Sequence, residues 1–151
     1  MRRIPLIALM LHALIVLPAQ AVEVSPVAKA VEEYMEFTEY GSSIIFPEQI
    51  PAEDWSRILV IDARDAEQFA RGHIPGAVNI EWRQIPARRD SIPRDSMVLI
   101  YGNTGSLSAQ SVFAMRLLGW DNVKVLQDGF EGWKAKGGFE ANRRASRPAG
   151  H

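Results

Sequence analysis

Short apolar segments alternate with segments of helical character, and this alternation constrains the fold of the chain more than any other feature. The apolar segments are residues 44–46, 58–61, 77–80, 97–101 and 123–126. Short apolar strands joined by helices are typical of a parallel β-sheet that is covered by helices on both faces. Because 151 residues suit one domain with its own core, the sequence predicts a single α/β domain.

A short polar loop, residues 102–107, follows the predicted strand at 97–101, and a helix is expected from Ser108 onward. Binding sites in parallel sheets form outside the carboxyl ends of the strands. A loop that leads into a helix also gathers backbone N–H groups that can hold an anion. We therefore expect a candidate ligand-binding loop made of Gly102, Asn103, Thr104, Gly105, Ser106 and Leu107.

The composition excludes several kinds of chemistry. The chain has no cysteine, which rules out disulfides, thiolate catalysis and thiolate-bound metal. Its three histidines, His12, His73 and His151, are far apart in sequence, so neither a metal site nor a cofactor is expected. The formal net charge of −1 gives no basic footprint for nucleic acid. Loop 102–107 itself contains no histidine, lysine, arginine or carboxylate.

The first 21 residues, 1–21, have the organisation of a secretory signal peptide. Arg2 and Arg3 precede an apolar run of 14 residues, and Ala-Gln-Ala at 19–21 forms a small-x-small cleavage pattern. The run is shorter than the roughly 20 residues that a membrane-spanning helix needs, so cleavage is expected rather than a membrane anchor. The mature chain is then expected to be periplasmic or secreted, with no stable membrane insertion and a net charge of −3.

A helical extension is expected within residues 22–43, ahead of the sheet. Ser25, followed by proline, is typical of a helix start, and the helix is expected to end just before Gly41. The extension either packs on the domain or docks a partner. Residues 44–138 then form the domain, and residues 139–151, which lack a core pattern, are expected to form a flexible tail.

Several spaced motifs resemble those of the rhodanese-like domain family. They occur in the family's order, and they are LVIDAR at 59–64, GHIPGAVNI at 72–80, LLGWDNV at 117–123 and DGFEGW at 128–133. The resemblance extends over about residues 44–138. It implies a single rhodanese-like domain with a central parallel sheet flanked by helices on both faces.

The resemblance also implies where sulfur chemistry would take place. Rhodanese domains transfer sulfane sulfur through a loop cysteine, which accepts sulfur as a persulfide and passes it to a thiophilic acceptor. The cysteine position, directly after the strand, is Gly102 here, and Asn103 and Leu107 stand where basic residues often hold the anionic donor. The hydroxyls of Thr104 and Ser106 have no base nearby in sequence and cannot form a stable persulfide. These departures argue against sulfur transfer, and no catalytic residue is expected.

We therefore expect an inactive rhodanese-like domain that binds a protein partner in the periplasm. The alternative is a binding protein for a small oxyanion or sulfur compound that uses loop 102–107 without chemistry. An enzyme with other chemistry is a third interpretation, for which the sequence shows no nucleophile and base. Asp62 and Arg64, at the end of the strand at 58–61, are expected at the pocket rim. They either contact a ligand or form a structural ion-pair network.

Overall fold

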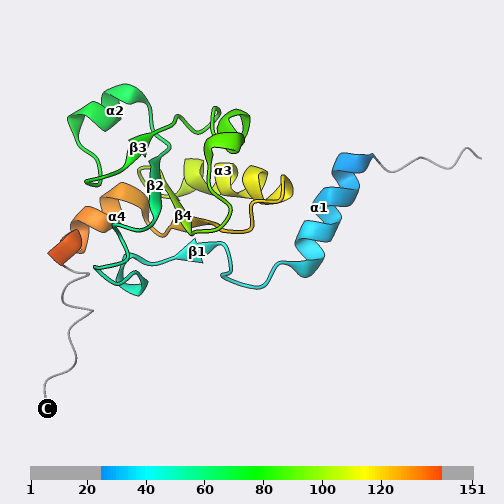
Figure 1. The fold of residues 1–151 in the computed structure, drawn as a ribbon, viewed down its shortest axis with the longest axis horizontal. Coiled ribbons are helices and arrows are strands. Elements are labelled where there is room, and N and C mark those ends of the chain that lie inside the picture. The colour runs from blue at the N-terminus through cyan, green and yellow to red at the C-terminus, as the bar shows by residue number, and fades with distance from the viewer. Residues whose placement is uncertain (1–24, 141–151) are drawn as a thin grey trace, which may run out of the picture.

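A computed structural model describes residues 25–140, and Figure 1 shows its fold. The predicted signal peptide, 1–21, and residues 141–151 of the predicted tail lie outside the described residues. One five-stranded sheet has the order β1-β5-β4-β2-β3, and every neighbouring pair is parallel. The expected parallel α/β fold is confirmed. The strands are β1 (Ile44–Ile45), β2 (Leu59–Asp62), β3 (Val78–Asn79), β4 (Val98–Tyr101) and β5 (Val123–Leu126).

Strand β4 lies at the centre of the sheet and is buried along its whole length. Its Ile100 lies opposite Ile61 of β2 and Val125 of β5. A strand that is covered on both faces has no polar side, which explains why β4 is a continuous apolar run. Because β2 and β4 end in register at Asp62 and Tyr101, the residues that follow them meet at one edge of the sheet.

The sheet separates two apolar layers, because successive side chains along a strand point to opposite faces. Helix α3 (Ser106–Leu117) covers one face, where Val112 and Met115 pack with Ile61 and Ile100. Helices α2 (Ala66–Arg71) and α4 (Gly129–Ala135) cover the other face. There, Phe69, Phe130 and Trp133 of the two helices pack with Val60 and Leu99 of the sheet. Helices on both faces were predicted, and this prediction is confirmed. Two 3₁₀ turns, Pro47–Gln49 and Pro86–Ser91, complete the connections.

Helix α1 (Pro26–Phe37) has few contacts with the domain. Its N-cap is Ser25, as expected, and the Ser25 hydroxyl accepts a hydrogen bond from the Ala28 N–H at 3.1 Å. None of its residues is buried, and it lies beside α3 (Figure 1). The ring of Tyr34 lies edge-on to Phe113 of α3, at 5.1 Å between the ring centroids. The helix thus contacts the domain without becoming part of its core.

The C-terminal end of the described range also belongs to the domain. Phe139, which the sequence assigned to the tail, lies edge-on to Trp55 and Trp133 at 5.2 and 5.3 Å between ring centroids. The packed part of the chain therefore extends one residue beyond the predicted boundary at 138. No helix within residues 25–140 is both long and apolar enough to span a membrane.

Candidate functional site

The candidate loop is shorter than the sequence suggested, because α3 begins at Ser106 rather than at Ser108. Ser106 and Leu107 thus form the first turn of the helix. Gly105 is the N-cap, with a φ of 114° that lets the chain turn directly from the loop into the helix. The Ser108 hydroxyl is not the cap, and instead it donates a hydrogen bond to the Gly105 carbonyl at 2.9 Å.

The N-terminus of α4 holds the carbonyl groups of this loop. The Phe130 N–H donates to the Gly102 carbonyl at 2.8 Å, and the Glu131 N–H donates to the Asn103 carbonyl at 3.0 Å. A trans peptide points its N–H away from its carbonyl, so the N–H groups of Asn103 and Thr104 face away from α4. Within the described chain, the backbone N–H groups of residues 103–108 donate no hydrogen bond. The loop therefore offers a row of free donors at the start of α3.

Gly102 is buried, yet its backbone conformation does not require glycine. Its φ lies outside the left-handed region, and a Cβ placed on it would lie 3.6 Å from Leu107 Cβ and 3.9 Å from the Ser108 nitrogen. Both are ordinary van der Waals distances. The loop thus retains room for a side chain beside its free N–H groups.

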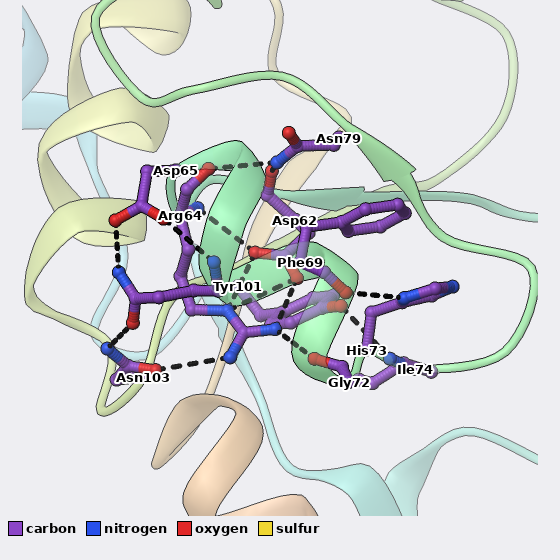
Figure 2. A network of polar contacts seen from close by, with 11 residues as sticks. Asp62, Arg64, Asp65, Phe69, Gly72, His73, Ile74, Asn79, Tyr101 and Asn103 are labelled. Carbon is purple, nitrogen blue, oxygen red and sulfur yellow. Dashed lines mark hydrogen bonds and ion pairs between the residues drawn. The ribbon is translucent and has the colours of Figure 1, made fainter.

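Asp62 and Arg64 form the polar core next to the loop (Figure 2). The Arg64 guanidinium donates to both carboxylate oxygens of Asp62, from Nε to Oδ1 at 2.9 Å and from Nη2 to Oδ2 at 2.6 Å. Arg64 Nη2 also donates to the Gly72 carbonyl at 2.8 Å, and the guanidinium lies 4.3 Å from the centre of the Phe130 ring. The hydrogen bonds to Asp62 raise the pKa of Arg64.

The two residues of this pair differ in their position relative to the pocket. Asp62 is fully buried and does not line the neighbouring cleft, whereas Arg64, which is only 4% exposed, is one of the residues that line it. The position of Arg64 is therefore compatible with the predicted pocket rim, and contact with a ligand stays a prediction. The geometry is that of an ion-pair network that fixes the surrounding loops. Asn79 extends this network, since its amide donates to the backbone carbonyls of Asp62 and Arg64 at 3.0 and 2.8 Å.

Asn103 connects this network to the candidate loop. Arg64 Nη1 donates to Asn103 Oδ1 at 3.3 Å, and Asn103 Nδ2 donates to Gln68 Oε1 at 2.7 Å. Gln68 in turn donates to Asp65, the N-cap residue of α2. Figure 2 shows this chain of contacts, which joins residues 64–68 to Asn103 in the loop after β4. The side chain of Asn103 is thus held in place rather than free to follow a ligand.

A cleft of about 360 Å³ lies beside Asn103, and three basic side chains line it. The sequence of the loop does not predict these basic side chains, because they come from α2, α4 and the end of β2. Each of them has a carboxylate partner. The pairs are Arg64–Asp62 and Arg71–Glu67 at 2.6 Å and Lys134–Glu131 at 3.0 Å. Since these charges are matched, the cleft attracts an anion only weakly.

The hydroxyl groups of the loop were also compared with the histidines and carboxylates of residues 25–140 as possible bases. Within the described residues, no hydrogen bond joins Thr104, Ser106 or Ser108 to a histidine or a carboxylate. His73 Nδ1 lies 2.9 Å from the Phe69 carbonyl, and its ring stacks on Phe69. No group of three or more histidine and acidic residues in the described range is arranged to hold a metal ion.

Comparisons with known proteins agree with this geometry. Residues 48–136 match the family model described as rhodanese-like domain. A sulfurtransferase of Allochromatium vinosum is 32% identical over 84 residues, which cover 56% of this chain and 78% of that protein. An uncharacterized protein of Bacillus subtilis is 32% identical over 82 residues, covering 54% of this chain and 65% of that protein.

Among solved structures, a rhodanese-related protein from Thermoplasma volcanium matches with a TM-score of 0.57 and 22% identity. The match covers 63% of this chain and 93% of that protein. A human single-domain sulfurtransferase matches with a TM-score of 0.54 and 23% identity, covering 62% of this chain and 96% of that one. At these identities the two structures establish the fold alone.

Proposed function

Because the chain belongs to the rhodanese-like domain family and contains no cysteine, we propose that it is a non-catalytic binding or accessory module. The observation that carries the proposal is Gly102, which follows β4 where the family places its nucleophile. Sulfur transfer needs a thiolate that attacks the donor and retains sulfur as a persulfide. The hydroxyls of the loop cannot substitute for it, because they lack both a base and a stable persulfide form.

A protein partner in the periplasm or outside the cell is the ligand that we propose first. The signal-peptide pattern of residues 1–21 supports the compartment. The rigid Asn103 side chain and the matched charges of the cleft support a preformed recognition surface rather than a reactive site. Partner groups that accept hydrogen bonds, such as carboxylates, would complement the N–H groups of residues 103–108.

A thiosulfate-to-cyanide sulfur-transfer assay tests the absence of catalysis. The purified chain is expected to show no turnover above a boiled sample, while the Allochromatium vinosum sulfurtransferase serves as a comparison for assay conditions. Turnover well above the boiled sample would overturn the proposal.

Affinity capture tests the binding role. Residues 22–151 serve as bait in a periplasmic extract, and captured proteins are identified by mass spectrometry. A matched bait carries Thr104→Arg, which adds bulk and charge at an exposed loop position without touching the core. One stoichiometric partner that the altered bait loses supports the proposal. If neither bait captures a protein, the result contradicts a protein partner and favours a small ligand.

The alternative function is the binding of a small oxyanion or sulfur compound, and the free N–H groups of residues 103–108 favour it. The cations of the neighbouring cleft are paired, so we expect weak, millimolar affinity. Calorimetry with thiosulfate, sulfite, sulfate and phosphate decides this, with Thr104→Glu as a repelling variant. No heat at millimolar ligand would exclude the alternative.

A further inference from the structure

A second cavity lies between α1 and the end of α3, and no residue of loop 102–105 lines it. Its volume of about 520 Å³ falls within the range of small-molecule sites, which is roughly 300–1,000 Å³. Figure 1 shows α1 beside the end of α3, and both helices contribute residues to the lining of this cavity. Tyr34, Phe37 and Leu117 form apolar parts of its wall.

Two hydrogen-bond donors at this cavity have no acceptor. Arg116 Nε and the Ser42 hydroxyl are buried and make no hydrogen bond within the described chain. Arg116 donates only through Nη1, to the Asp121 backbone carbonyl at 3.2 Å, and no described carboxylate lies within 4.0 Å of its guanidinium. Because the guanidinium of Arg116 has no carboxylate partner among the described residues, a negatively charged group in the cavity would be attracted to it.

Acidic side chains line the same cavity without meeting Arg116. Glu39 and Asp121 form no ion pair within residues 25–140, and Glu33 has only a 3.7 Å contact with the exposed Lys29. Opposite charges therefore share one cavity without pairing with each other. A ligand with a single charge could complement either Arg116 or the acidic side chains, but not both.

We propose that this cavity binds a small zwitterion of the free apolar amino-acid class. Its carboxylate would accept charge-assisted hydrogen bonds from the guanidinium of Arg116. Its ammonium would lie near Glu39 and Asp121, and its apolar side chain would lie against the aromatic wall. An aromatic ring can also face the ammonium group, which adds to the attraction. The site is independent of loop 102–105 and of the function proposed for it.

Calorimetry on the full chain tests the proposal with three probes that differ only in charge. They are L-phenylalanine, phenethylamine, which lacks the carboxylate, and 3-phenylpropionate, which lacks the ammonium. L-phenylalanine is expected to bind, and each analogue is expected to bind at least tenfold more weakly. No heat with L-phenylalanine at 10 mM, or equal binding of either analogue, would overturn the proposal.

Three variants locate the site. Arg116→Gln and Glu39→Gln are each expected to weaken L-phenylalanine binding at least tenfold. Glu36→Gln is the matched control, because Glu36 lies on α1, three residues before Glu39, and does not line the cavity. If Arg116→Gln fails to fold, Glu39→Gln still decides the question, since Glu39 is exposed. Chemical-shift changes on L-phenylalanine addition are expected at residues 33–42, and changes confined to the loop would contradict the location.

Discussion

The substitution Gly102→Cys asks whether the loop still recognises a thiolate. The fold should tolerate it, because the added Cβ meets Leu107 Cβ at 3.6 Å and the Ser108 nitrogen at 3.9 Å. The backbone at Gly102 also lies outside the left-handed region that disfavours side chains. The new thiol would lie beside the free N–H groups of residues 103–108.

The size of the effect follows from the number of donors. A hydrogen bond to a charged group contributes about 1.5–3 kcal/mol, and one pKa unit corresponds to about 1.4 kcal/mol. Two such bonds at the lower limit stabilise the thiolate by about 3 kcal/mol, which lowers the pKa by roughly two units. Starting from an ordinary cysteine pKa of about 8.5, we expect a value of about 6.5 for Gly102→Cys.

The rate of alkylation by iodoacetamide as a function of pH measures this pKa. Gln110→Cys provides the control, because Gln110 is exposed on α3 and lies beyond the row of free donors. Its thiol is expected to titrate near the ordinary value of about 8.5. The reasoning is refuted if Gly102→Cys folds and titrates at or above the control.

Sulfur transfer from thiosulfate is nevertheless expected to remain low in Gly102→Cys. Asn103 and Leu107 supply no charge to gather an anionic donor. The cations of the neighbouring cleft do not compensate, because each is paired with a carboxylate. Rapid turnover from this single substitution would show that backbone N–H groups alone can hold the donor.

Three further predictions concern stability. Gly129→Ala should lower the free energy of unfolding by more than about 2 kcal/mol in urea melts, because its φ is 59° and a Cβ would lie 2.5 Å from the Gly102 carbonyl oxygen; an unchanged midpoint would contradict this. Arg64→Ala should cost about 3–5 kcal/mol by leaving the Asp62 carboxylate buried and unpaired, and a loss below about 1 kcal/mol would argue against that role. Hydrogen bonds from Gln68 lower the pKa of Asp65 in the folded chain below its ordinary value of 3.8. The ionised Asp65 therefore stabilises the fold at pH values above 3.8, and this contribution is lost as the pH falls through the lowered pKa. The urea unfolding midpoint of Asp65→Asn should therefore depend less on pH at acidic pH than that of the unaltered chain. The same pH dependence in both proteins would contradict the role of the ionised Asp65 as the N-cap.

The sequence predicted best what depends on neighbouring residues. The cap at Ser25 was predicted correctly, because an N-cap is recognised by its own side chain and the next few residues. The strands were predicted from apolar runs, which a strand buried on both faces requires. The start of α3 was missed, because it depends on the backbone angle of Gly105 and not on a side-chain cap.

The polar environment of the loop could not be predicted in the same way. Arg71 on α2 and Lys134 on α4 line the same cleft as Asn103, although each is more than 30 residues from it in sequence. The pairing of Arg64 with Asp62 was anticipated as one alternative, but its burial depends on Gly72, which closes over it. Such contacts come from the packing of α2 and α4 on one face of the sheet, which local patterns do not specify.

The structure also explains how this fold can persist without its nucleophile. The loop accepts hydrogen bonds from the N-terminus of α4. The N–H groups of Phe130 and Glu131 donate to the Gly102 and Asn103 carbonyls. Gly129 allows the close approach, since any Cβ there would clash with the same two residues. These contacts use only the backbone of the loop, and they are made whatever side chain occupies position 102. The conformation of the loop is thus maintained by backbone packing and does not depend on a side chain at position 102, where this chain has glycine.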